Sequence, residues 1–247
     1  MGYIKTTQQK YKISSVYTKE RQSLHERIIA YFMSDNQMVT ENPEAILLGG
    51  GSASGKSRMG DLIITGYKEA GIPLIQIDSD EIKRLIPEYE QMGAYNKDAA
   101  AAHVHDESSD IVDELLMRCM KEQKNFMYDG TMKNLPKYRN LIQKLIDLGY
   151  KVSATIVDVP IEVAKEREHL RYLDIGRKVP EEVLIESHKS VPKTFYLLKE
   201  MVHEYIIFDA TEEGLPVEIA EKTEDGNEII YDKDKLEKFY KKSGIKL

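Results

Sequence analysis

The chain has 247 residues, of which 41% are hydrophobic and 31% charged, a composition typical of a globular protein with a sizeable core. Its net charge of −7 argues against a general nucleic-acid binder, because binding to a phosphate backbone needs a dense basic surface. The single cysteine, Cys119, excludes an intramolecular disulfide, and no apolar run approaches the roughly 18 residues that span a bilayer. We therefore expect a cytoplasmic protein without a membrane segment.

The first 15 residues have no clear hydrophobic period, and we expect them to form a loosely held arm. A helix is predicted over residues 18–33, with Thr18 as its N-cap. Strands that alternate with helices predict a mostly parallel sheet flanked by helices, an α/β fold. The strands are predicted at 45–48, 73–77, 126–128, 152–157 and 205–208, and the helices at 56–70, 80–85, 99–123, 136–148, 160–173 and 180–202.

The C-terminal stretch has a different pattern. Two alternating segments, 217–222 and 228–231, are joined around Asp225-Gly226, which is a strong signal for a β-hairpin. A short charged helix is predicted over 234–242. We expect these elements to extend the main sheet domain rather than to form a domain of their own.

A glycine-rich segment follows the first core strand and opens a helical pattern. Small residues let backbone N–H groups turn toward phosphate oxygens, and the helix presents its positive N-terminal end to the same anion. Lys56 would reach the β- and γ-phosphates, and the Ser57 hydroxyl would bind Mg²⁺. The segment predicts a P-loop site for ATP and Mg²⁺, formed by Gly50, Gly51, Ser52, Ala53, Ser54, Gly55, Lys56 and Ser57.

Acidic residues follow the next two strands. The second core strand, which we expect beside the strand of the phosphate loop, runs into Asp78 and Asp80, and the third runs into Asp129 and Thr131. Ligands of parallel sheets bind at the carboxyl ends of the strands, where a carboxylate can accept a proton from a hydroxyl or hold Mg²⁺ through water. Either aspartate of the first pair could instead cap the next helix, a role that we favour for Asp78.

Basic residues form the third part of the pattern. Arg167 and Arg171 are four residues apart and share one face of a predicted helix, and Arg177 follows in the turn before Pro180. Planar guanidinium groups stabilise the charge that develops on the transferred phosphate. The alternative is a solvated helix face, on which these arginines pair with Glu166, Glu168 and Asp174.

Taken in order, these residues resemble the zeta toxins. The resemblance runs from about residue 17 to residue 208, and chloramphenicol phosphotransferases share parts of it. It implies a P-loop kinase that uses ATP and Mg²⁺ to phosphorylate the 3′-hydroxyl of the amino sugar in UDP-N-acetylglucosamine. It also implies a small helical antitoxin as a partner. The resemblance rests on Tyr17, Thr18, Arg21 and His25, the phosphate loop, residues 78–87, residues 129–131, Arg167 and residues 176–180.

The resemblance assigns roles to individual residues. Lys56 corresponds to the family's phosphate-binding lysine, and Asp80 to its proposed general base. The family has a substrate-binding glutamate where this chain has Asp129, followed by Thr131, and a helix glutamate where an ungapped alignment gives Asp113. Both departures shorten the side chain by one methylene and bear on the identity of the acceptor.

The resemblance also implies two arginines that clamp the phosphates, Arg167 and Arg177, with Arg171 as a competitor for the first role. We therefore expect one P-loop kinase domain over residues 1–247, with a core at about 43–210, an N-terminal helical arm at 1–42 and a C-terminal hairpin and helix at 215–247. The expected acceptor is a nucleotide sugar.

Two other functions fit the same phosphate loop. One is another small-molecule, nucleoside or polynucleotide kinase, although the acidic balance argues against nucleic acid as a partner. The other is a non-catalytic regulatory module that binds a nucleotide. A GTPase switch would carry an Asn-Lys-x-Asp segment, and Asn96-Lys97-Asp98 does not match that pattern. Consumption of ATP that depends on an acceptor separates a kinase from such a module.

Overall fold

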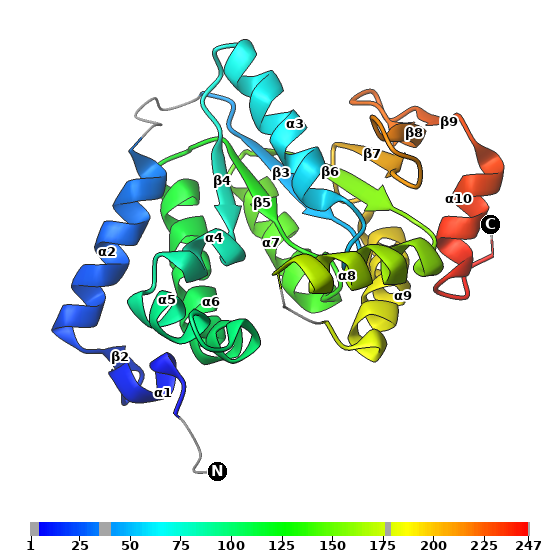
Figure 1. Cartoon of the computed structure of the whole chain (residues 1–247). Coiled ribbons are helices and arrows are strands. Elements are labelled where there is room, and N and C mark those ends of the chain that lie inside the picture. The colour runs from blue at the N-terminus through cyan, green and yellow to red at the C-terminus, as the bar shows by residue number, and fades with distance from the viewer. Residues whose placement is uncertain (1–4, 35–40, 176–178, 247) are drawn as a thin grey trace.

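The computed structural model describes residues 5–34, 41–175 and 179–246 (Figure 1). Its helices are α1 (Thr7–Tyr11), α2 (Lys19–Met33), α3 (Lys56–Glu69), α4 (Ser79–Arg84), α5 (Pro87–Gly93), α6 (Lys97–Lys121), α7 (Leu135–Asp147), α8 (Ile161–Ile175), α9 (Glu181–Leu198) and α10 (Lys233–Lys241). Its strands are β1 (Lys12–Ile13), β2 (Val16–Tyr17), β3 (Glu44–Gly49), β4 (Ile75–Asp78), β5 (Phe126–Asp129), β6 (Lys151–Asp158), β7 (Glu204–Asp209), β8 (Val217–Lys222) and β9 (Glu228–Ile230).

The main sheet has 7 strands in the order β4-β5-β3-β6-β7-β8-β9. The first five strands of this order are parallel, and β8 and β9 continue the sheet as an antiparallel hairpin. This confirms the predicted α/β fold with its mostly parallel sheet and its C-terminal hairpin. One expectation is wrong: β5 lies between β4 and β3, so β4 is not the neighbour of the strand that leads into the phosphate loop.

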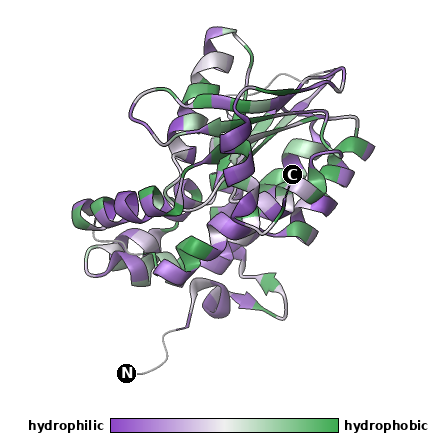
Figure 2. Cartoon of the chain, turned by 90° about the vertical axis from the view of Figure 1, so that its right-hand side faces the viewer, coloured by the Kyte–Doolittle hydropathy of each residue, from purple (hydrophilic) through white to green (hydrophobic). Residues whose placement is uncertain are grey.

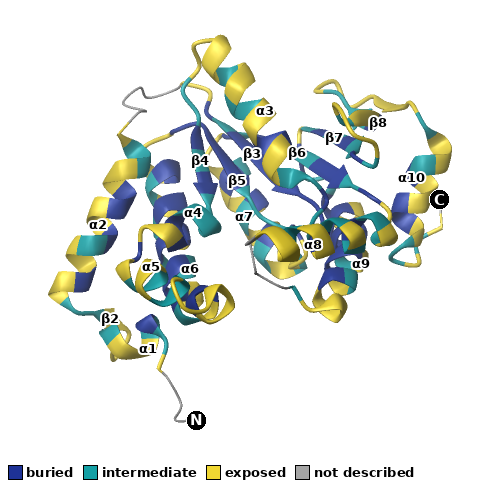
Figure 3. Ribbon diagram, viewed as in Figure 1, coloured by how far each residue is buried: buried dark blue, intermediate teal, exposed yellow. Residues whose placement is uncertain are grey.

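The two faces of the sheet bury different side chains, because successive residues of a strand point to opposite sides. On one face, Ile46 and Leu48 pack with residues of α3 and α8. On the other face, Ala45 and Leu47 join a larger cluster that includes residues of α6, α7, α9 and α10. Figure 3 shows buried strands between helices with exposed outer faces, and Figure 2 shows hydrophobic and hydrophilic residues mixed along these helices. The helices are therefore amphipathic covers of the sheet.

The N-terminal segment is not a loosely held arm over the part that the structure describes. Helix α1 and the β1–β2 hairpin lie beside α6, and three side chains converge on Asp110 of that helix. Lys12 Nζ and Tyr17 Oη each lie 2.7 Å from Asp110 Oδ2, and Gln8 Nε2 lies 2.9 Å from the same atom. These contacts are polar and link distant parts of the chain, so they leave no hydrophobic period in the sequence.

Two further boundaries differ from the predictions. Pro87 does not only end the preceding helix; it is the first residue of α5, a position that suits proline because the first helical N–H has no partner in the helix. Helix α9 ends at Leu198, earlier than predicted.

In the described part of the chain, no helix is both long enough and apolar enough to cross a membrane.

Candidate active site

The phosphate loop connects β3 to α3. Its backbone has positive φ at Ala53 (58°) and at Gly55 (99°), and Gly55 is the N-cap of α3. Glycine tolerates this left-handed conformation, which explains the second glycine of the motif. Because α3 begins at Lys56, its first backbone N–H groups have no acceptor within the helix and are available to an anion. The loop thus has the anion-binding geometry that the motif predicts.

Lys56 bends back over its own loop. Its Nζ donates to Gly50 O at 3.0 Å and to Gly51 O at 3.1 Å. Burial lowers the pKa of Lys56, and the Asp129 carboxylate opposes this shift. Two neutral carbonyls are weak partners for a half-buried cation, so a phosphate that enters the loop offers Lys56 a better one.

A cavity of about 760 Å³ brings most of the predicted site residues together. It lies at the phosphate loop and at the carboxyl ends of β4 and β5, and α8 forms another wall. From the predicted set it is lined by Ser52, Ala53, Ser54, Gly55, Lys56, Ser57, Asp78, Asp80, Asp129, Thr131, Arg167 and Arg171. Ligand binding at this edge of the sheet is what the parallel topology predicts.

Asp78 and Asp80 have different roles in the structure. Asp78 is the N-cap of α4, and its Oδ1 accepts from Asp80 N at 2.8 Å, as we predicted for this residue. The side chain of Asp80 is 45% exposed, and its Oδ1 lies 2.8 Å from Nζ of the buried Lys83. The Asp80 carboxylate is therefore accessible from the cavity and oriented by a fixed cation.

Asp129 lies at the centre of the acidic edge. It pairs in register with Leu48 of β3 on one side and with Asp78 of β4 on the other. Burial raises the pKa of Asp129 to about 6, Lys56 opposes this shift, and the nearby Asp78 and Asp80 add to it. A carboxylate with this pKa accepts protons more readily near neutral pH than an ordinary aspartate does.

The segment after Asp129 runs along the phosphate loop. Gly50 N donates to Thr131 O, and Gly130 N donates to Leu48 O, both at 3.3 Å. A Cβ at Gly130 would lie 1.9 Å from the hydroxyl oxygen of Tyr138, so only glycine fits between Asp129 and Thr131. This close approach explains the glycine in the middle of the predicted Asp129-Gly130-Thr131 segment.

The two described arginines of α8 have different partners. Arg167 Nη2 donates to Ala210 O at 2.6 Å and to Thr211 O at 3.1 Å, just beyond the end of β7. Arg171 Nη2 donates to Glu168, and Arg171 Nε is buried without a hydrogen-bond partner among the described residues. Arg171 therefore has a buried donor that a ligand could satisfy. Arg177, the other predicted clamp, lies outside the described residues.

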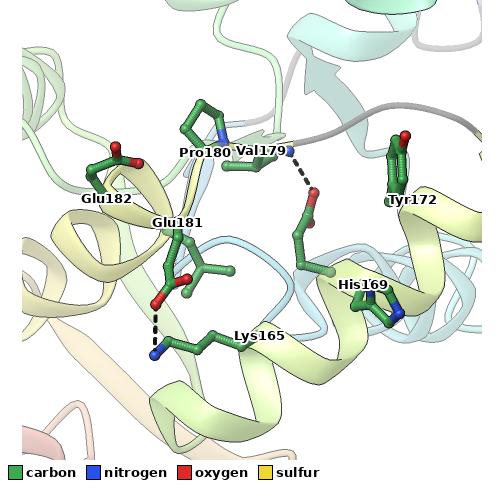
Figure 4. Close-up of a pocket in the computed structure, with 9 residues that line it drawn as sticks. Lys165, His169, Tyr172, Val179, Pro180, Glu181 and Glu182 are labelled. Carbon is green, nitrogen blue, oxygen red and sulfur yellow. Dashed lines mark hydrogen bonds and ion pairs between the residues drawn. The ribbon is translucent and has the colours of Figure 1, made fainter.

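Glu168 connects Arg171 to the backbone that follows the predicted arginine turn. Its Oε1 accepts from Val179 N at 2.8 Å, the dashed line that ends at Val179 in Figure 4. Lys165 and Glu181 form an ion pair at 2.8 Å across the same gap between α8 and α9. Figure 4 shows these contacts around a second cavity of about 670 Å³. Helix α8 and the start of α9 are thus joined by polar contacts around this second cavity.

Asp113 lies beside the cavity, where its Oδ1 is 3.2 Å from Nζ of Lys137. Lys137 is one of several polar lining residues that sequence reasoning missed: His105, Ser109, Tyr128, Lys133, Asn134 and Lys137. His105 and Ser109 are four residues apart on α6, a spacing that puts both on one helix face. Lys133, Asn134 and Lys137 follow Thr131 directly, so their place after a strand end was the available signal.

The polar atoms that line the cavity fit a nucleotide with Mg²⁺. Ser54 Oγ is buried in the loop without a hydrogen-bond partner among the described residues, as a group that awaits a ligand would be. Ser57 and Asp129 supply oxygen atoms, which are the ligands that Mg²⁺ prefers. The described residues contain no group of three or more His, Cys, Asp or Glu that could hold a metal ion alone. Mg²⁺ would therefore share its ligands with phosphate oxygens and water.

Comparison with known proteins agrees with this geometry. A sequence model of the zeta toxin family matches residues 29–240. Toxin PezT of Streptococcus pneumoniae serotype 4 is 26% identical over 137 residues, which are 55% of this chain and 53% of PezT. The aligned part thus spans about half the length of that curated relative.

Solved structures show the same fold. A structure of the PezAT chromosomal toxin-antitoxin system of Streptococcus pneumoniae has a TM-score of 0.70 and 18% identity, and the match covers 91% of this chain and 89% of that chain. The complex of AvrRxo1-ORF1 and AvrRxo1-ORF2 with ATP has a TM-score of 0.77 and 20% identity, with 96% and 82% covered. These matches confirm the predicted fold class.

Proposed function

Because the chain belongs to the zeta toxin family, we propose that it is a kinase that uses ATP and Mg²⁺ to phosphorylate a hydroxyl of UDP-N-acetylglucosamine or a related nucleotide sugar. One observation supports this most: the phosphate loop, Lys56 and three strand-end carboxylates all line a single cavity. Such a cavity offers a place for the phosphate donor next to groups that can activate a hydroxyl. Both substrates are cytoplasmic metabolites, so we propose that the protein acts in the cytoplasm.

The donor side of the reaction follows from the loop. The N–H groups at the start of α3 would bind the β- and γ-phosphates, and Lys56 would move from Gly50 O and Gly51 O to the phosphate oxygens. Bound at Ser57, Mg²⁺ would neutralise charge on these phosphates. Arg171, and Arg177 by resemblance, would stabilise the charge of the transferred group.

The acceptor side follows from the acidic edge. A sugar hydroxyl is a weak nucleophile at neutral pH, so a carboxylate that accepts its proton accelerates the transfer. Asp80 is accessible from the cavity and oriented by Lys83, which suits a general base. Asp129 would bind the acceptor and is the alternative base, because its pKa is about 6.

The rest of the cavity wall supports a phosphorylated acceptor. Lys133 and Lys137 line it near Thr131, and His105 and Ser109 add further hydrogen-bonding groups. A nucleotide sugar carries two phosphates for the lysines and several hydroxyls for the polar groups. The structural relatives include a toxin-antitoxin system, so we also propose that a small antitoxin controls this site.

The test is phosphate transfer from labelled ATP. The purified protein is incubated with Mg-ATP and, in separate reactions, UDP-N-acetylglucosamine, other nucleotide sugars, nucleosides, chloramphenicol or a 5′-hydroxyl oligonucleotide. We expect label in a nucleotide sugar, and none when the Lys56→Ala variant replaces the wild type. Transfer to a nucleoside or an oligonucleotide instead would replace the proposed acceptor. Absence of transfer to every acceptor, together with intact ATP binding, would favour a regulatory nucleotide-binding module.

A further inference from the structure

Two neighbouring side chains of α9 hold one residue of the phosphate loop, Ser52, at both of its backbone polar groups. Ser52 N donates to Ser187 Oγ at 2.9 Å, and His188 Nε2 lies 2.8 Å from Ser52 O. Ser187 Oγ itself donates to Leu184 O at 2.7 Å, which leaves its lone pairs for Ser52 N. Because a carbonyl oxygen only accepts, the His188 proton must be on Nε2.

The contact is buried and close-fitting. Ser187 is 3% exposed and His188 is 1% exposed. A Cβ at Gly51 would lie 2.4 Å from the His188 ring, so the loop approaches the imidazole as closely as glycine allows. The second residue of the phosphate loop is therefore glycine because of a side chain more than a hundred positions away in the sequence.

His188 contributes a donor and not only volume. Its Nδ1 is buried without a hydrogen-bond partner among the described residues, which costs stability that an apolar ring would not cost. Burial lowers the pKa of His188 to about 4, so the ring is neutral near pH 7 and keeps its Nε2–H. What an imidazole supplies here beyond an apolar ring is the hydrogen bond to Ser52 O.

The same helix forms part of the cavity wall. Val183 and Ser187 of α9 line the cavity, together with Val179 just before the helix begins. Val179 N is held by Glu168, whose other carboxylate oxygen accepts from Arg171. The phosphate loop is thus connected through α9 to the arginine-bearing helix α8.

We propose that Ser187 and His188 are positioning residues that hold the phosphate loop in its nucleotide-binding conformation before ATP arrives. This inference rests on the proposed ATP-dependent function. A loop of glycines and small residues loses much conformational freedom when it closes on a phosphate. Hydrogen bonds that order the loop beforehand reduce that cost at the moment of binding.

The inference predicts a specific kinetic pattern. With Ser187→Ala or His188→Leu, the loop must be ordered by ATP itself, so the Kd of Mg-ATP rises about tenfold, or about 1.4 kcal/mol. At saturating ATP, kcat falls by a smaller factor than the rise in Kd, because bound ATP orders the loop. A merely structural role would lower the folded fraction and thus kcat, and would leave the ATP affinity of the folded molecules unchanged.

The experiment is calorimetric titration of the full chain with Mg-ATP, after thermal unfolding has shown that each variant is folded. The variants are Ser187→Ala, His188→Leu and His188→Gln, because the glutamine amide can place a donor close to the position of Nε2. The control is Ser190→Ala, which removes a half-buried serine of the same helix whose hydroxyl bonds to Glu186 and to no residue of the phosphate loop in the described part of the chain. We expect weaker binding for the first two variants and near-wild-type binding for His188→Gln and Ser190→Ala.

Each other outcome decides the question. Wild-type affinity in folded Ser187→Ala and His188→Leu would overturn the inference and leave the kinase proposal intact. Equal weakening in His188→Leu and His188→Gln would show that the ring acts by its shape, which overturns the role of His188 as a donor. If His188→Leu does not fold, Ser187→Ala and His188→Gln carry the test. A wild-type protein that does not bind Mg-ATP would overturn the proposed function itself.

Discussion

Arg21 and Glu107, which lie 86 residues apart in the sequence, form a buried bidentate ion pair. Arg21 Nε is 2.5 Å from Oε1 of Glu107, and Arg21 Nη2 is 2.7 Å from Oε2. His25 Nε2 lies 2.7 Å from Oε1 of the same carboxylate, and Glu88 of α5 takes the other side of the guanidinium. The pair joins α2 and α5 to α6, the helix that carries His105 and Ser109 into the cavity. It therefore positions part of the cavity wall.

The first prediction concerns the stability of this pair. Replacing Arg21 by methionine leaves two carboxylates without their cation, and the loss of one partner from a buried pair costs about 3–5 kcal/mol. We expect Arg21→Met to lower the free energy of unfolding by that amount in urea denaturation at pH 7. The control is Arg118→Met, which removes the more exposed pair with Glu26 and should cost at most about 1 kcal/mol. Equal losses in the two variants would contradict the structural role of Arg21.

The same carboxylate predicts how stability depends on pH. Burial raises the pKa of Glu107, but hydrogen bonds from His25 and Arg21 outweigh burial and lower the pKa to about 2. Because the folded-state pKa is depressed, ionised Glu107 stabilises the protein above its ordinary pKa of 4.5, and this contribution is lost as the pH falls toward 2. Urea denaturation over this range should show a weaker pH dependence for Glu107→Gln than for the wild type. An unchanged slope would mean that Glu107 does not titrate in this way.

Much of the fold could be predicted from local patterns. The strands β3 and β6, the phosphate loop and the hairpin around Asp225-Gly226 were predicted because apolar runs, glycines and turn residues report the conformation of their own segment. The strand order was not, because nothing in β4 states that β5 will lie between it and β3. The docking of the N-terminal segment on Asp110 was also missed, since polar contacts across the chain have no periodic signal.

The site shows the same division. The P-loop motif and the strand-end aspartates could be singled out because each lies in one short segment, helical spacing indicated Arg167, and the resemblance supplied Asp113. Ser187 and His188 were not found, because a serine and a histidine on a helix indicate nothing until the fold brings them to Ser52. Physical contact between distant segments is what the sequence leaves undetermined.

The next prediction tests the phosphate loop. If Lys56 neutralises the β- and γ-phosphates, Lys56→Ala should reduce phosphoryl transfer by at least about 10²-fold, a typical cost of removing one group that stabilises transition-state charge. Thermal unfolding should change little, because among the described residues the Lys56 amine donates to two carbonyls of its own loop. The control is Lys68→Ala at the exposed end of the same helix. Wild-type turnover in a folded Lys56→Ala variant would refute the P-loop assignment.

The arginines allow a test of transition-state stabilisation. If Arg177 stabilises the charge of the transferred phosphate, Arg177→Ala should lower kcat more than it weakens ATP binding, and Arg177→Lys should not restore it fully, because lysine cannot donate two parallel hydrogen bonds. We expect the same pattern for Arg171→Ala. For Arg167→Ala, whose Nη2 is held by Ala210 O and Thr211 O, we expect a larger effect on ATP affinity than on kcat. Steady-state kinetics combined with ATP titration separates the two effects. If Arg177→Ala changes ATP affinity and leaves kcat unaltered, Arg177 binds the phosphates of ATP in the ground state and does not stabilise the transition state.

The last prediction concerns the general base. Asparagine keeps the shape of aspartate and can still cap a helix, but it cannot take a proton at neutral pH. Asp78 acts through its cap on Asp80 N, so Asp78→Asn should lose little activity, whereas Asp80→Asn should lose roughly 10²–10⁴-fold in transfer while it still binds ATP.

The dependence of kcat on pH shows whether Asp129, the alternative base, accepts the proton instead. Asp129 ionises as the pH rises through about 6, so if Asp129 accepts the proton, wild-type kcat should fall below that pH. Asp80→Asn would then retain activity and its acidic limb, and Asp129→Asn would lose both. All three variants are measured at saturating ATP and acceptor. An inactive Asp78→Asn variant would make Asp78 the base in place of Asp80.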